Sequence, residues 1–252
     1  MALVLSGDGT ISGANLNIDS DGAASFAGLT VDTSTLHVDA TNNRVGIGTT
    51  SPLTKFTVSG GYISQTNAGV STYFGEDGSG GSLAGTVTNH YFRFITNDAE
   101  RMRIDASGRV TTPYQPVFLA GKDNDGGQIG TGDYVFDDSH INVGNHYNTT
   151  NGRFTAPVAG IYWFTTTLQT WGIAVGNFCQ FQFFKNGTGY PQGASGSLAM
   201  QVISQKTGAT DYHISYSLSG PIQLGAGDYV TVNITNGSAR GMQSHFAGYL
   251  IG

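Results

Sequence analysis

The sequence has few charged residues, and their scattered distribution argues against two classes of partner, nucleic acids and anionic membranes. Only 11% of the residues are charged, against roughly 25% in ordinary soluble domains, which is too few for a chain kept disordered by its own charge. The 11 lysines and arginines are scattered singly and outnumbered by 17 acidic residues, for a net charge of -6. Without a basic cluster we expect neither nucleic-acid binding nor attraction to an anionic membrane surface.

Cysteine and long apolar runs are also scarce. The single cysteine, Cys179, can form neither an intramolecular disulfide nor a cysteine-rich zinc site, and its place in the apolar run 178–181 predicts a buried, inert thiol. No run is long enough to insert into a membrane, and the apolar start at 1–5 has neither the basic residues nor the length of a signal peptide. We therefore expect a protein made in the cytoplasm and released by lysis, as a virion component is.

Proline is rare and glycine abundant, which favours many turns and short strands. The chain has 6 prolines and 38 glycines with no strict Gly-X-Y period, so collagen is excluded. Residues 1–60 hold small apolar clusters, such as 36–38 and 45–47, separated by turn residues. Strands this short cannot form a stable sheet alone. We therefore predict that residues 1–60 form a thin, intertwined trimeric β shaft.

Residues 61–114 continue this pattern, either as more shaft or as a separate small β domain. The clearest unit is a hairpin, with strand candidates at 91–95 and 101–104 joined by a polar turn.

Residues 115–252 have longer strands with a clear alternation of apolar and polar positions. Tyr162, Phe164 and Leu168 share one face of a strand, and Trp163 and Trp171 lie on the other. The same alternation recurs at 179–183, 212–218 and 230–234. About ten half-buried antiparallel strands predict an all-β sandwich or jelly roll, with no amphipathic helix.

The second half contains a Pro-x-x-Gly turn that leads into an aromatic strand at Phe154–Phe164. Four further segments accompany it: Tyr147–Arg153 before it, then Lys185–Gly187, Leu224–Val232 and Phe246–Ile251. In these segments and in their order the second half resembles the globular heads of the C1q family. This resemblance implies a ten-strand jelly-roll head at 115–252 that assembles as a homotrimer. It also implies a binding module and not an enzyme.

The first half contains three distinctive segments, Leu36–Asp39, Asn43–Pro52 and Asn97–Val110. In these segments the first half resembles phage tail fibres. In that group such segments often precede a self-cleaving chaperone domain, whereas here the head follows. We therefore expect the head itself to trimerise and to raise the effective concentration of the shaft strands.

Motifs for catalysis and cofactors are weak. The six histidines form no HExxH pair, and neither a GxSxG elbow nor a phosphate-cradling loop is present, so we expect no enzyme. The run Asp123-Asn124-Asp125-Gly126 starts like a calcium loop but lacks the later glutamate. Asp123 and Asp125 are therefore candidate ligands for Ca²⁺, with a solvated turn as the alternative; no other cofactor is expected.

Candidate contact residues lie at predicted strand ends and at the N-terminus. Aromatic and amide side chains suit the recognition of a sugar or a protein surface; the candidates are Trp171, Tyr190, Gln192 and Arg240. The alternative for Trp163 and Trp171 is packing in the trimer interface. The apolar N-terminal residues are candidates for docking into the virion, with a frayed terminus as the alternative; they are Met1, Ala2, Leu3, Val4 and Leu5.

The sequence therefore predicts a homotrimeric phage tail fibre. Its N-terminus would bind other virion proteins, and its head would bind a host cell-surface glycan or protein. The main alternative is a virion fibre without receptor duty, such as a head fibre, a decoration spike or a tail adaptor fibre. A bacterial surface or spore-coat protein with a C1q-like head and an enzyme are further alternatives.

Overall fold

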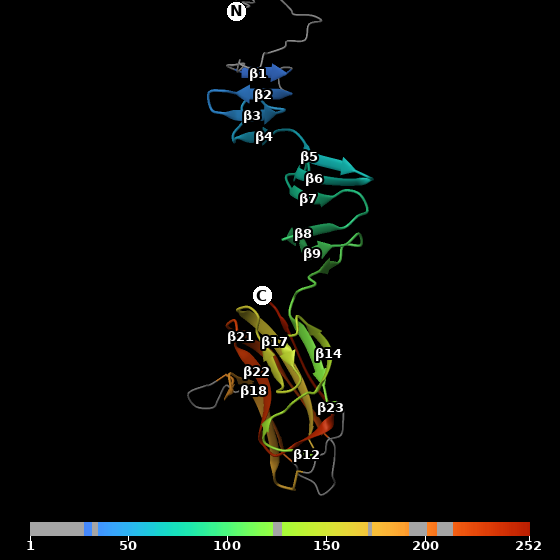
Figure 1. Cartoon of the computed structure of the whole chain (residues 1–252), viewed down its shortest axis with the longest axis vertical. Coiled ribbons are helices and arrows are strands. Elements are labelled where there is room, and N and C mark those ends of the chain that lie inside the picture. Colours follow the sequence, from blue (N-terminus) through green and yellow to red (C-terminus); the bar gives the residue numbers. More distant parts are fainter. Residues whose placement is uncertain (1–27, 32–34, 123–127, 171–172, 192–200, 206–213) are drawn as a thin grey trace, which may run out of the picture. The chain divides into compact units, whose positions relative to one another are not determined.

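The computed structural model describes residues 28–31, 35–122, 128–170, 173–191, 201–205 and 214–252. In these ranges the chain forms 23 strands and no helix (Figure 1), which confirms the all-β prediction. It follows that none of these ranges contains a helix long and apolar enough to span a bilayer. The chain divides into two compact units, one of residues 1–92 with 105–107 and one of residues 93–104 with 108–252.

The first sheet pairs four short strands in chain order. They are β1 (Gly28–Val31), β2 (Leu36–Asp39), β3 (Arg44–Ile47) and β4 (Phe56–Val58). The pairs are antiparallel except for the parallel pair of β3 and β4. The turn between β2 and β3 is closed by the Asp39 carboxylate, which accepts the backbone N–H groups of Thr41 and Asn42 at 3.1 Å each. Local hydrogen bonds of this kind are why aspartate and asparagine favour turns.

Two three-stranded sheets follow. One holds β5 (Tyr62–Asn67), β6 (Val70–Glu76) and β7 (Ser82–Thr86), and the other β8 (Phe92–Thr96), β9 (Ala99–Ile104) and β10 (Val110–Thr111). The hairpin of β8 and β9 confirms the one predicted from the sequence. Its two turn residues, Asn97 and Asp98, have φ angles of 51° and 56°, the left-handed pair that a tight two-residue hairpin turn requires.

These small sheets have no hydrophobic core of their own. Between residues 35 and 114 only Gly46 and Pro52 are buried, and apart from proline every buried apolar side chain of the described residues lies at or after Phe118. The strands pair within one chain; the intertwining of three chains stays a prediction.

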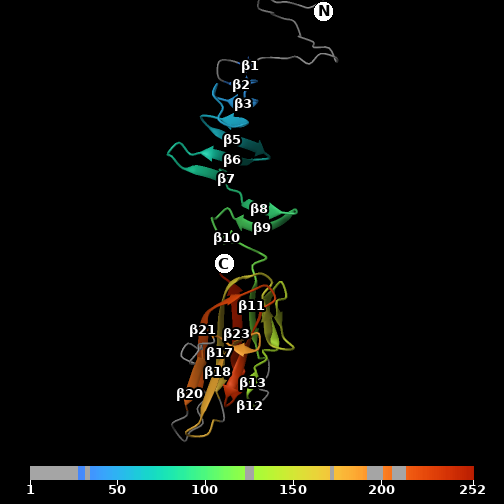
Figure 2. The ribbon, with the colours of Figure 1, turned by 90° about the vertical axis from the view of Figure 1, so that its left-hand side faces the viewer.

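Residues 117–250 form the head, in which two sheets face each other (Figures 1 and 2). The front sheet has the order β14-β11-β23-β17-β21 with β12 on β23, and the back sheet the order β15-β16-β22-β18-β19 with β13 on β22 and β20 on β18. The strands are β11 (Val117–Gly121), β12 (Gln128–Ile129), β13 (Gly132–Asp133), β14 (Asp138–Val143), β15 (Tyr147–Asn148), β16 (Arg153–Thr155), β17 (Gly160–Thr170), β18 (Phe178–Lys185), β19 (Thr188–Gly189), β20 (Gln201–Gln205), β21 (Ile214–Leu224), β22 (Tyr229–Asn236) and β23 (Ala239–Leu250).

Neighbouring strands in each sheet are mostly distant in sequence, as in a jelly roll. This confirms the predicted fold. The strands outnumber the ten expected because β12, β13, β15 and β19 are only two residues long, too short to leave a periodic pattern.

Aromatic side chains fill the space between the two sheets. The predicted inward face of β17 is confirmed, since Tyr162, Phe164 and Leu168 are all fully buried. Phe118 lies between the rings of Tyr147 and Phe154, with ring centroids 4.9 Å away on either side. Stacked and edge-to-face contacts of this kind add to the burial of apolar surface, so the core holds both sheets together.

The alternation predicted for 212–218 is confirmed only in part. Residues 212–213 lie outside the described residues, and Ile214 is 43% exposed at the start of β21. From Leu218 to Leu224 every second residue is buried, so the strand continues past the predicted segment.

Candidate functional site

The outward side of the front sheet is apolar where its central strands meet. Phe118, Phe164 and Phe246 point inward, so the alternation of side chains sends their neighbours outward. Trp163 of β17 lies directly opposite Tyr249 of β23, and Tyr249 lies opposite Val117 of β11.

We call this surface the apolar front face. It comprises Val117, Leu119, Ile141, Trp163, Ala247 and Tyr249, which line a shallow hollow of about 250 Å³. Ile141 and Tyr249 are 44% and 48% exposed, and Ile161 next to them is 45% exposed. No acidic or basic residue lines the hollow. Contiguous apolar surface on a soluble protein marks a site of association.

The apolar front face is relevant to the alternative role of Trp163 and Trp171, which is packing in the trimer interface. Trp163 lies at the centre of the apolar front face with its side chain only half-buried, so part of its surface remains for a second subunit to cover. Trp171 lies outside the described residues. Sequence reasoning placed Trp163 on the outward face of its strand but missed Ile141 and Val117. Val117 lies opposite Tyr249, more than a hundred residues away, and Ile141 joins the same face only through its pairing with Leu119 on β11.

The predicted contact residues do not gather on one surface in the described part of the chain. Tyr190 follows β19 in the back sheet, where its N–H donates to the Phe183 carbonyl at 2.9 Å and its half-buried side chain packs against the core. Arg240 lies in β23 of the front sheet, and its carbonyl accepts the Tyr134 hydroxyl at 2.7 Å. Gln192, like Trp171 and the N-terminal residues 1–5, lies outside the described residues, so the roles of all these residues stay predictions.

The calcium ligands proposed from the sequence, Asp123 and Asp125, also lie outside the described residues. Beside them, Lys122 forms an ion pair with Asp137, and His140 Nε2 lies 3.2 Å from a carboxylate oxygen of Asp138. Among the residues that the structure does describe, no three His, Cys, Asp or Glu side chains converge as metal ligands would. Calcium binding stays a prediction.

Burial shifts the pKa of several groups in the core. Desolvation raises the pKa of the Cys179 thiol to about 11 and that of the Tyr134 hydroxyl to about 12, because a charged form is costly in an apolar interior. Cys179 is fully buried and its thiolate is disfavoured, so the side chain is a poor nucleophile, as its sequence context indicated.

Asp228 connects the turn at Lys185–Gly187 to the start of β22. Its carboxylate accepts a hydrogen bond from the Asn186 amide at 2.8 Å, accepts the Gly225 N–H at 2.8 Å and lies 2.9 Å from the Lys185 ammonium. These contacts, that of the Asn186 amide first, lower the pKa of Asp228 to about 2. The turn at Lys185–Gly187, one of the segments that carry the C1q resemblance, is thereby tied to the start of β22.

The comparisons with known proteins agree with this architecture. The C1q domain family matches residues 118–251, more than half of the chain. Two solved structures that match the chain are the globular domain of zebrafish complement 1qA and murine APRIL. The first is 15% identical, with a TM-score of 0.39 over 55% of this chain and 98% of that one. The second is 12% identical, with a TM-score of 0.41 over 54% and 99%.

The head is thus a jelly roll of the C1q type, a class of binding domain that commonly forms trimers and is typically not enzymatic. The chain belongs to the C1q-domain family through residues 118–251.

Proposed function

We propose that the protein is a homotrimeric virion fibre of a tailed phage, whose C1q-type head recognises the host cell surface. The N-terminal residues 1–5 attach it to other virion proteins, and the particle carries it out of the host when the cell lyses. The virion context rests on the segments 43–52 and 97–110, which resemble tail fibres, and not on the head.

One observation supports the trimeric fibre above all others. Between residues 35 and 114 no apolar side chain larger than proline is buried, and Ile63, Phe74 and Phe94 are each about half exposed, at 51%, 49% and 50%. Small sheets without a buried face are unstable alone. Contact with further copies of the same segment removes this apolar surface from water, which is what a fibre shaft of several chains provides.

The head supplies a second contact between the same chains. The apolar front face is uncharged and exposed, and C1q domains commonly form trimers. Three copies meeting through this face would bury Trp163 and Tyr249 at their junction. A head that trimerises also brings three shafts together, which raises the effective concentration of their strands.

A virion fibre without receptor duty fits the same architecture. A head fibre, a decoration spike or a tail adaptor fibre needs the trimer and the virion attachment but not the recognition of a cell. The exposed loops of the head favour the receptor role, since binding residues concentrate on loops held by a rigid scaffold.

The experiment that tests the proposal has two arms. Light scattering on the purified full chain measures the mass of the particle in solution, and a fluorescently labelled sample measures binding to host cells and protection from infection. A trimer that binds cells and blocks infection supports the receptor role, and a trimer that does neither supports the non-receptor fibre. A monomer would overturn the fibre itself.

A further inference from the structure

The head carries a pocket at the end farthest from where the chain reaches it. The chain arrives at Val117, opposite Tyr249 near the end of β23. β23 begins at Ala239, opposite Thr170, and its 12 residues cover about 35–40 Å at the rise of a strand. Figures 1 and 2 both show β12 at one end of the head and the C-terminus at the other. The pocket lies at the Ala239 end, between the loop before β18, the turn between β22 and β23, and Gly130 after β12.

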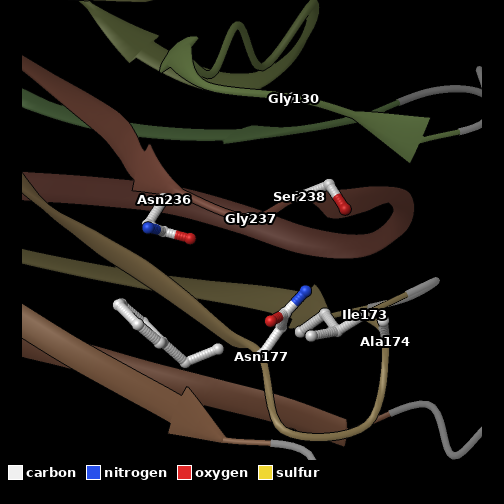
Figure 3. A pocket seen from close by; sticks show the side chains of 8 residues that line it. Gly130, Ile173, Ala174, Asn177, Asn236, Gly237 and Ser238 are labelled. Carbon is white, nitrogen blue, oxygen red and sulfur yellow. The ribbon is translucent and has the colours of Figure 1, made fainter.

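The pocket has a volume of about 480 Å³, within the range of small-ligand sites. The side chains of Asn177, Asn236 and Ser238 face the space between the two loops (Figure 3). Ile173 and Phe178 supply an apolar wall, and Ile173 is 9% exposed. Two segments distant in sequence therefore present polar groups and an apolar surface to one space.

The backbone fixes both loops in place. The Asn177 N–H donates to the Ala174 carbonyl at 3.0 Å, and Gly176 has a φ of 86°, a conformation that favours glycine. Gly237 has a φ of 73°, and a Cβ there would lie 2.7 Å from the Phe178 carbonyl oxygen and 2.9 Å from the Cys179 Cα. Only a residue without a side chain lets this turn sit against β18, so the pocket is formed before any ligand arrives.

The chemistry of the lining selects a neutral, hydroxyl-rich ligand. No ionisable residue lines the pocket, so a phosphate, a carboxylate or an ammonium would lose its hydration without a counter-charge. Within the described part of the chain, the side-chain amides of Asn177 and Asn236 make no hydrogen bond. Each amide offers donors and an acceptor together, the pairing that a sugar hydroxyl needs, while Ile173 and Phe178 suit the C–H face of a sugar ring.

We propose that this pocket binds an uncharged sugar residue of a cell-surface glycan. The inference rests on the proposed function, because it names the ligand class through which the head of the fibre would contact a cell. In a fibre attached by its N-terminus, the pocket lies at the end of the head away from the incoming chain, where a surface is met first.

The test uses the full chain and defined sugars. Saturation-transfer NMR measures binding of glucose, galactose, rhamnose and N-acetylglucosamine, with glucuronic acid and galactose 6-sulfate as charged counterparts. We expect binding of at least one neutral sugar in preference to the charged ones. Asn177→Ala and Asn236→Ala each weaken it by about tenfold, the effect of one lost hydrogen bond, and the double variant abolishes the signal.

Two further variants separate loss of the site from loss of the fold. A Cβ at Gly130 meets no atom within 4 Å, so Gly130→Trp can fill the pocket without disturbing the backbone and also abolishes binding. Asn89→Ala removes an exposed amide outside the head and leaves binding unchanged. All five variants, the double variant included, unfold at the wild-type temperature, since none removes a buried contact.

Each outcome of these measurements either supports or overturns the assignment of the pocket as a sugar site. Lack of binding to every neutral sugar, stronger binding of the charged ones, or binding that survives both Gly130→Trp and the double variant overturns the pocket assignment. Cell binding by a trimer that fails these sugar tests leaves the proposed function standing. Sugar binding lost in the pocket variants, by a protein that ignores host cells, supports the pocket while the receptor role fails.

Discussion

The substitution Tyr249→Asp tests the apolar front face as the contact between heads. Tyr249 is 48% exposed in the single chain, and an aromatic side chain has roughly 150–250 Å² to bury, so about 100 Å² remains available to a partner. At about 25 cal/mol per Å² this contributes about 2.5 kcal/mol per chain and about 7 kcal/mol per trimer. The change to Asp removes this contribution and places carboxylates on a face that lacks counter-charges.

The expected result is dissociation measured by light scattering. A loss of about 7 kcal/mol lowers the assembly constant about 10⁵-fold, so dilution to the low micromolar range converts the variant to monomers while the wild type stays assembled. Val175→Asp is the matched control, because Val175 is 58% exposed on the loop at the other end of the head. A Tyr249→Asp protein that assembles and melts like the Val175→Asp protein would refute the front face as the interface.

Three further predictions concern the folded head. Cys179, fully buried with a pKa of about 11, does not react with Ellman's reagent in the native protein and reacts on unfolding in guanidinium; fast native reaction would contradict its burial. The lowered pKa of Asp228, about 2 against an ordinary 3.8, gives a stabilisation that is full above the ordinary pKa and lost as the pH falls through about 2. The melting-temperature gap between wild type and Asp228→Asn should therefore close on acidification, and a constant gap argues against the ion contacts. Gly248→Ala places a Cβ 2.5 Å from Phe164 Cδ1 and 2.9 Å from Phe118 Cε1; we expect a loss of about 1–3 kcal/mol in denaturant unfolding, and an unchanged midpoint would show that the aromatic core can shift.

The strand periodicity of the head could be predicted because one buried face imposes it. Tyr162, Phe164 and Leu168 alternate with outward residues, and all three are buried as expected. Short strands such as β12 and β13 could not be predicted, since two residues carry no period. Thr166 is fully buried in the same inward row although it is polar, because its hydroxyl donates to the His245 carbonyl at 2.8 Å, a long-range contact that no local pattern reveals.

The pocket could not be predicted from the sequence either, because the two turns that form it are distant along the chain. Asn177 and Asn236 each stand beside a glycine, the ordinary signature of a turn, and nothing in either turn indicates the other. The jelly-roll topology joins them, with β18 paired to β22 so that Gln180 lies opposite Asn236. Tyr190 and Arg240 are candidates by their position near predicted strand ends alone, and the structure places Arg240 in β23 of the front sheet and Tyr190 just after β19 of the back sheet.

Assembly into a trimer raises the affinity with which weak sugar pockets bind a repetitive surface. In a closed ring of three chains every subunit has the same orientation relative to the axis, so the three pockets lie at the same height along it. Where the long strands of the head run along that axis, the three pockets lie together at one end of the assembled head. A site with two amides, a hydroxyl and a small apolar wall gives modest affinity for a single sugar. Three such sites on a repetitive glycan surface bind together, and linked sites of this kind gain about 10²–10⁴-fold over one. Binding to a cell therefore depends on both the apolar front face and the pocket: Tyr249→Asp, which leaves each pocket intact, should preserve binding of a free sugar and lose binding to a cell.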